Sequence, residues 1–118
     1  MGKTGKAGKT DRPKAPKHLA VPTRRWFETV VETFELEAHH VRLLTLAAES
    51  WDRGVMAREA IAEHGLTFSD RHGAVRARPE VAIERDSRIA FARLLRELTL
   101  DVDPPPDIRV PRRAGTGR

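Results

Sequence analysis

Apolar residues in the first third of the chain recur every three or four positions. They are Trp26, Phe27, Val30, Val31 and Phe34. This spacing places them on one side of an α-helix, and Thr23 precedes them as a candidate N-cap. The pattern predicts a short N-terminal helix that begins near Thr23.

A second and longer helical pattern follows a short connection at residues 35–37. Its apolar seam alternates steps of three and four residues through Val41, Leu44, Ala48, Trp51 and Val55. With Gly65 as the stop, a helix from Ala38 to His64 would span about 40 Å, whereas a compact globule of this size is about 30 Å across. Either the helix breaks near Gly54 or it packs against a neighbouring subunit. We expect a continuous helix in an oligomer.

The helical spacing of apolar residues stops between Gly65 and Pro79. Two short runs, 66–68 and 74–76, flank a polar turn in which Gly73 can take positive φ, so a small β-hairpin is predicted. Pro79 suits the first turn of a C-terminal helix, which the prolines at 104–106 follow. Its apolar side comprises Ile83, Ala90, Phe91, Leu94, Leu95 and Leu98. On its surface, Glu84 and Arg88 form a predicted i,i+4 ion pair. The predicted fold class is mainly α.

Charge divides the chain of 118 residues into three parts. All five lysines lie in residues 3–17, and the formal charge is +7 over residues 1–25, −5 over 26–103 and +3 over 104–118. The first segment has almost no large apolar side chains, so ordering it would cost entropy that burial does not offset. We therefore expect a disordered basic arm at 1–22, a helical core at 23–101 and a disordered Pro/Arg-rich tail at 102–118.

Composition excludes several classes of protein. The chain has no cysteine, which excludes disulfides and thiolate metal sites. It also lacks a run of about 20 apolar residues that could cross a bilayer. A soluble, intracellular protein without membrane contact is predicted.

Catalytic chemistry is hard to place on these residues. His39 and His40 are adjacent, so their side chains are expected to diverge by about 100° on a helix rather than share a metal ion. His64 and His72 flank the hairpin, but no carboxylate or cysteine spacing completes a site around them. We predict no catalytic residue, no metal site and no cofactor, and hence no enzyme.

Basic residues instead indicate a polyanionic partner. The arm and the start of the first helix offer Lys3, Lys6, Lys9, Lys14, Lys17, Arg24 and Arg25 as phosphate contacts. The hairpin offers Arg71, Arg76 and Arg78, because a two-stranded ribbon fits the major groove of DNA. These arginines could equally pair with acidic residues of the core or of a neighbouring subunit.

The order of elements resembles the small subunits of bacteriophage terminases. The similarity covers residues 24–101 and is sharpest over 64–101, where His64-Gly65-Leu66, Gly73 to Pro79 and the closing leucine-rich helix fall in the family's order. Two positions depart from its pattern: Arg78 stands where a histidine commonly precedes the proline, and Thr99 where a glycine often closes the last helix.

The resemblance implies a non-catalytic DNA-recognition factor in the host bacterial cytoplasm. Such a factor assembles into a homo-oligomeric ring of roughly eight to ten subunits, binds double-stranded viral DNA at the start of genome packaging and delivers it to the terminase large subunit. The arm would then bind DNA, while the 38–65 and 79–100 helices would form the contacts between subunits.

Three alternatives stay open. A small host DNA-binding regulator with a helix-turn-helix would need a compact recognition helix, which the sequence does not indicate. A protein-interaction module would show no DNA binding at low salt. A histidine-dependent nuclease would nick DNA in the presence of metal and would depend on His64 or His72.

Overall fold

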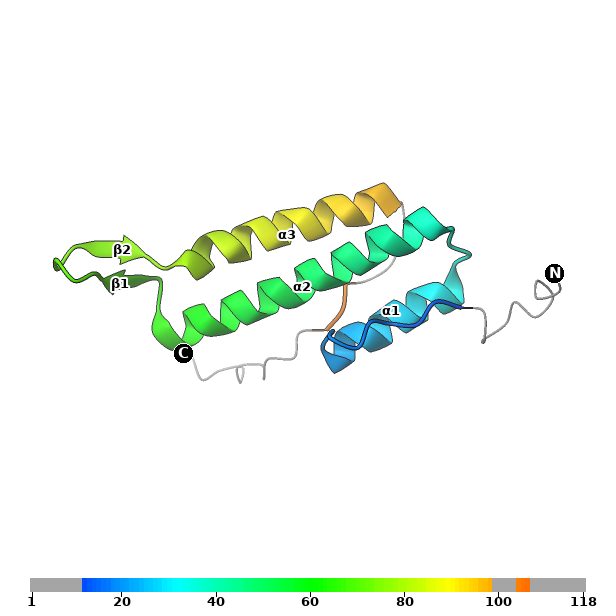
Figure 1. The fold of residues 1–118 in the computed structure, drawn as a ribbon, viewed down its shortest axis with the longest axis horizontal. Helices are drawn as coiled ribbons and strands as arrows, with labels where there is room; N and C mark the ends of the chain where they lie inside the picture. The colour runs from blue at the N-terminus through cyan, green and yellow to red at the C-terminus, as the bar shows by residue number, and fades with distance from the viewer. Residues whose placement is uncertain (1–11, 99–103, 107–118) are drawn as a thin grey trace, which may run out of the picture.

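A long helix forms the centre of the protein. The computed structural model describes residues 12–98 and 104–106. Its elements are α1 (Val21–Thr33), α2 (Ala38–His64), β1 (Thr67–Ser69), β2 (Val75–Ala77) and α3 (Pro79–Leu98). In Figure 1, α3 runs antiparallel along one side of α2, and α1 lies against the other side of its first half. The predicted mainly helical fold with a small hairpin is confirmed.

The start of α1 differs from the prediction. The helix begins at Val21 with Pro22 in its first turn, and Ala20 is an N-cap without a side-chain bond. Thr23 lies inside the helix, is 1% exposed, and donates its hydroxyl to Asp52 of α2 at 2.5 Å. The prediction that Thr23 caps the helix was wrong. The acceptor at this end of α1 is Asp52, whose second carboxylate oxygen accepts the Ala20 N–H at 2.8 Å.

Residues 12–20 also differ from the predicted disordered arm. Leu19 is 3% exposed within the core, and Ala15 packs against the same cluster. These two apolar side chains, Ala15 between two lysines and Leu19 just after the last one, supply burial that the overall composition concealed. The rest of the predicted arm, residues 1–11, lies outside the described residues.

The 27-residue helix α2 is continuous through Gly54, as expected. Gly54 is buried, and a Cβ added there would lie 3.5 Å from the Cβ of Ser87, so α2 and α3 approach closely at this level. Because α3 accompanies α2, the domain is an elongated helical layer rather than a compact globule. The length of α2 therefore gives no argument for an oligomer, and assembly stays a prediction.

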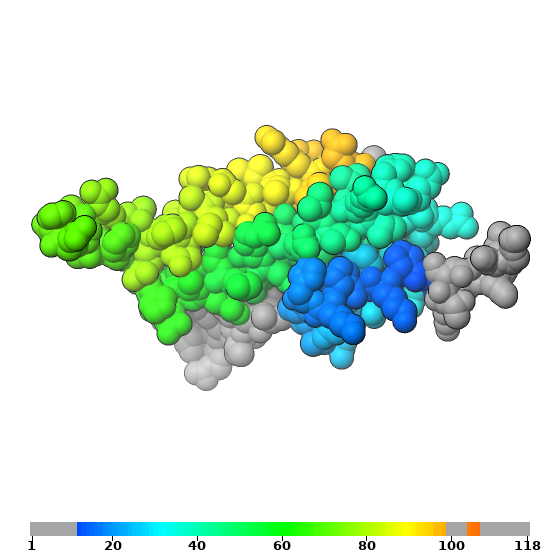
Figure 2. Space-filling model, viewed as in Figure 1, coloured from blue at the N-terminus to red at the C-terminus, as the bar shows by residue number. Residues whose placement is uncertain are grey.

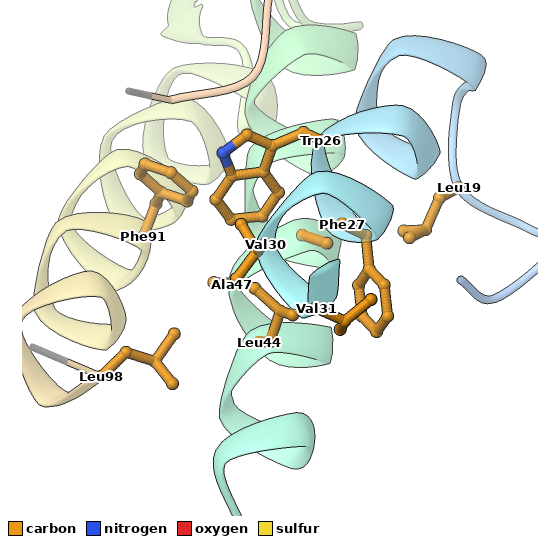
Figure 3. Close-up of a cluster of buried hydrophobic side chains, with 10 residues drawn as sticks. Leu19, Trp26, Phe27, Val30, Val31, Leu44, Ala47, Phe91 and Leu98 are labelled. Atoms are coloured by element: carbon orange, nitrogen blue, oxygen red, sulfur yellow. The ribbon is translucent and has the colours of Figure 1, made fainter. Parts of the chain in front are cut away.

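The core gathers where all three helices meet. Phe27 and Val30 of α1 pack with Leu44 and Ala47 of α2, and each is at most 1% exposed. Figure 3 shows these side chains between the helices, with Phe91 contributed by α3. The Phe91 ring lies 5.9 Å from the Trp26 ring and 5.0 Å from the Trp51 ring, centroid to centroid. Edge and offset contacts of this kind stabilise the junction beyond simple burial.

The predicted hairpin is confirmed and projects beyond the end of α2 (Figure 1). Its antiparallel strands pair Thr67 with Ala77, Phe68 with Arg76 and Ser69 with Val75. All six strand residues are exposed. The ribbon is thus held by its own turn and its attachment to α2 and α3.

The C-terminal tail is described only at its prolines. Pro105 is buried and lies beside Trp51 and Phe91, so this short piece packs back onto the helices. The other residues of the predicted tail lie outside the described residues. Within the described part of the chain, no helix is apolar and long enough to cross a membrane.

Candidate nucleic-acid interface

The predicted DNA-contacting residues divide into two groups along the molecule. Lys14, Lys17, Arg24 and Arg25 lie in or just before α1, whereas the hairpin carries three further arginines. Asp52 of α2 lies beside the start of α1. From Asp52 to the end of α2, where the hairpin begins, there are 12 helical residues, or about 18 Å. The structure does not bring the two groups into one site. Lys3, Lys6 and Lys9 lie outside the described residues.

The α1 group is only partly available to a ligand. Lys14, Lys17 and Arg25 are exposed, so their charges face solvent. Arg24 is half-buried, and its Nε is fully buried without a hydrogen-bond partner in the described part of the chain. Arg24 therefore fits a packing role along its aliphatic stem better than a phosphate contact.

One carboxylate organises the hairpin turn. Asp70 Oδ1 accepts the N–H groups of His72 at 2.8 Å and Ala74 at 2.9 Å, while Oδ2 accepts Arg76 Nε at 2.7 Å. Gly73, with φ of 83°, allows the chain to reverse and donates its N–H to the Asp70 carbonyl at 2.9 Å. The Arg76 hydrogen bond, followed by those from Ala74 and His72, lowers the pKa of Asp70. The carboxylate is charged at neutral pH and holds the turn closed.

The three hairpin arginines have different environments. Arg76 is held by Asp70. Arg78 is half-buried, its Nε has no hydrogen-bond partner among the described residues, and its guanidinium lies 5.9 Å from the centre of the Phe68 ring. Arg71 is exposed within the turn itself. Side chains alternate between the faces of a strand, so Phe68, Arg76 and Arg78 share one face of the ribbon. This face combines an aromatic ring with two cations, which local contacts hold in place.

Three arginines on the outer side of α3 were not among the predicted contacts. Arg85, Arg93 and Arg96 are exposed and lie on the side of α3 opposite Phe91. Their spacing of eight and three residues repeats the helical period, and this is the signal that could have identified them. They form a third basic group on the molecule.

The start of α2 brings two imidazoles together, contrary to the expectation that adjacent histidines diverge. The rings of His39 and His40 lie 4.1 Å apart, and both come within 4.8 Å of the Glu37 carboxylate. The reason is a capping box: His40 Nδ1 accepts the Glu37 N–H at 3.1 Å, and the Glu37 carboxylate accepts the backbone N–H of His40 in return. These contacts close the first turn of α2.

The other histidine pair is not brought together. His64 ends α2 and His72 lies in the turn at the far end of the ribbon. The three-residue strands separate them by about 10 Å. The geometry therefore gives the nuclease alternative no paired imidazoles at this hairpin.

A cleft of about 390 Å³ opens between α2 and α3. Trp51 and Phe91 form its apolar wall, and the Arg58 guanidinium lies 5.6 Å from the centre of the Trp51 ring. The remaining lining residues are Ser50, Gly54, Ser87, Arg88 and Pro105. None of the described residues that line this cleft carries a carboxylate or an imidazole.

No family model, curated protein or solved structure matches the chain.

Proposed function

We propose that the protein is a bacteriophage terminase small subunit: a non-catalytic factor that forms a ring, binds double-stranded viral DNA and delivers it to the large subunit. The observation that supports the proposal most is the order of the elements that follow the basic N-terminal segment. A short helix, a 27-residue helix, a projecting ribbon and a 20-residue helix follow one another, as in the family that the sequence resembles.

Charge placement supports the DNA-binding part of this proposal. The lysines precede the helical layer, and the hairpin extends beyond that layer with its arginines exposed or stacked (Figure 1). Phosphate contacts by flexible cations give affinity without sequence preference. A rigid ribbon face with Arg76 and Arg78 can add contacts to base edges, because a two-stranded ribbon enters the major groove. In this proposal the arm supplies affinity and the hairpin supplies sequence preference.

The packing of Leu19 decides how much of the N-terminal arm can be removed to test DNA binding. Removing residues 1–22 would also remove Leu19 and the first turn of α1, and so would damage the core. Removing residues 1–11 deletes Lys3, Lys6 and Lys9 while keeping both features. Affinity for a linear duplex should be measured by fluorescence anisotropy over a series of salt concentrations.

If the arm binds phosphates, the truncation should reduce the slope of log affinity against log salt by about 0.9 for each phosphate that the arm no longer neutralises. The matched hairpin variant R71Q/R76Q/R78Q should also weaken DNA binding. Each of its arginines that contacts bases rather than phosphates should change the slope less than a lost phosphate contact of the arm does. An unchanged slope in the truncation would reject DNA contact by the arm, and unchanged affinity in the hairpin variant would reject DNA contact by the hairpin. Absence of any binding at low salt would favour the protein-interaction module.

Native mass tests the assembly part separately. Multi-angle light scattering should give a mass of roughly eight to ten subunits of 13.3 kDa, as a closed ring requires. A monomer or dimer at all concentrations would reject the ring.

A further inference from the structure

The cleft between α2 and α3 has the size and the walls of a small-molecule site. The two helices lie side by side along the layer (Figures 1 and 2), and Gly54, which has no side chain, is part of the lining. The volume of about 390 Å³ lies within the range of about 300–1,000 Å³ that is usual for ligand pockets. Trp51 and Phe91 give the cleft two aromatic rings, with 5.0 Å between their centroids. A flat apolar group packs well against such rings.

Two serine hydroxyls in the cleft are buried and unpaired. Ser50 of α2 and Ser87 of α3 are 6% and 5% exposed, and neither hydroxyl makes a hydrogen bond within the described residues. The indole N–H of Trp51 is likewise buried without an acceptor in this part of the chain. Buried polar groups normally have a hydrogen-bond partner, so a set of unpaired groups in one cleft is typical of a ligand site.

The polar groups of the cleft can all act as hydrogen-bond donors. Arg88 bonds Glu84 through Nε and Nη2, at 3.2 and 3.1 Å, while its Nη1 makes no hydrogen bond within the described residues. Arg58 places a second guanidinium 5.6 Å from the centre of the Trp51 ring. The serine hydroxyls donate as well. Because no described residue of the lining carries a carboxylate, the cleft matches an acceptor with negative charge.

We propose that this cleft binds a small aromatic carboxylate. Its ring lies against Trp51 and Phe91, and its carboxylate accepts hydrogen bonds from Arg88 Nη1 and the two serine hydroxyls. Bonds between a guanidinium and a carboxylate are charge-assisted and therefore strong. The aromatic walls favour an organic anion over inorganic phosphate, because phosphate has no apolar part to place against them. The site lies apart from the predicted DNA contacts and goes beyond the proposed function.

Titration with β-naphthoate tests the site. The chain has two tryptophans, so two-dimensional NMR should show two indole N–H signals, which a Trp26→Phe variant assigns. β-Naphthoate should shift the signal of Trp51, and isothermal titration calorimetry should show saturable binding at one site per chain. The neutral analogue β-naphthamide should bind at least about ten-fold more weakly, because it cannot form the charge-assisted bond to Arg88.

Two variants test the contacts of the carboxylate separately. Arg88→Gln should weaken β-naphthoate binding by about ten-fold or more, and Ser87→Ala by about three- to ten-fold. Arg85→Gln, an exposed position on the same helix that is not part of the lining, is the matched control and should leave the affinity unchanged. Circular dichroism should show the same helix content in all three variants. If Arg88→Gln loses helix content, Ser87→Ala still decides, because it leaves the bond between Arg88 and Glu84 intact.

Three results would overturn the proposal. The first is β-naphthoate that neither shifts the Trp51 signal nor produces heat of binding. The second is β-naphthamide that binds as tightly as β-naphthoate. The third is an equal loss of affinity in Arg85→Gln and Arg88→Gln, which would indicate general attraction to the positive charge of the chain.

The chain's own carboxylates provide a further test. Asp103 and Asp107 come two residues before and after Pro105, which lines the cleft. Binding of β-naphthoate should not require their removal, so D103N/D107N should bind it as the wild type does. Binding that appears only in D103N/D107N would show that the cleft holds a segment of this chain rather than a free ligand, and would overturn the proposal.

Discussion

Arg58 of α2 and Glu84 of α3 form an ion pair across the two long helices, with 3.3 Å between Nη1 and Oε2. The same carboxylate accepts two hydrogen bonds from Arg88, at 3.2 and 3.1 Å, and its side chain is 16% exposed. The predicted Glu84–Arg88 pair is confirmed, but it is one half of a bridge between helices. Arg58 also lies over Trp51, so the bridge ties the charged surface to the aromatic junction.

Replacing Glu84 by Gln should lower the free energy of unfolding by about 1–2 kcal/mol, because two arginines lose a charged acceptor. Chemical denaturation at pH 7 measures this. Glu97→Gln, an exposed position on the same helix, is the control and should change stability by less than about 0.5 kcal/mol. Equal effects of the two substitutions would contradict the bridge.

The same pair predicts a pH dependence. Hydrogen bonding by Arg88, with a further contribution from Arg58, lowers the pKa of Glu84 below its ordinary value of 4.5 despite its burial. A depressed folded-state pKa gives stability that is complete above the unfolded value and is lost as pH falls through the folded value. The stability difference between wild type and Glu84→Gln should therefore stay constant from pH 7 to about 5 and shrink below 4.5. A difference that grows on acidification would reject this assignment.

Periodicity predicted the elements of the fold because the interactions involved are local. The three-and-four spacing around Phe27 and Leu44 indicated two helices, and Gly73 indicated the turn. Those signals depend on residues within one or two turns of each other. Positive φ at Gly73 and the break at Gly65 were visible for the same reason.

Contacts distant in sequence were not predictable in this way. The partner of Thr23 is Asp52, 29 residues away, so the threonine resembled a cap. Leu19 comes two residues after the last lysine, Lys17, and only the packed structure shows its burial. The arginines on the outer side of α3 were not among the predicted contacts, although their spacing follows the helical period.

Gly54 offers a test of how closely the two long helices pack. An alanine Cβ would make ordinary van der Waals contacts there, at 3.5 Å to Ser87 Cβ and 3.6 Å to Arg58 Nη1. Gly54→Ala should therefore stabilise the protein by about 0.5–1 kcal/mol through helix propensity. Gly54→Leu should destabilise it by about 1–3 kcal/mol, because the larger side chain separates the helices. Thermal unfolding of both variants checks the opposite signs, and two stabilising substitutions would show that α2 and α3 are further apart.

Asp70 should control the order of the hairpin turn. In Asp70→Ala, the amides of His72 and Ala74 lose their acceptor and Arg76 loses its ion pair. Hydrogen exchange at these two amides should accelerate at pH 7, while the amides of α2 keep their protection. Ser69→Ala, an exposed strand position beside it, should leave their exchange unchanged. Equal acceleration in both variants would indicate a loosened ribbon rather than the removal of one acceptor.

The Thr23–Asp52 contact should anchor α1 to α2. Thr23→Val preserves the shape of the buried side chain but removes the hydroxyl that Asp52 accepts, and unfolding free energy should fall by about 1–2 kcal/mol. Thr29→Val is the matched control, because its hydroxyl donates to the Arg25 carbonyl on the exposed side of the same helix. It should change stability by less than about 0.5 kcal/mol. Asp52→Asn in the Thr23→Val background should cost less than Asp52→Asn alone, since the two residues share one interaction. Additive effects in this double-mutant cycle, measured by chemical denaturation, would show that the two side chains stabilise the junction independently.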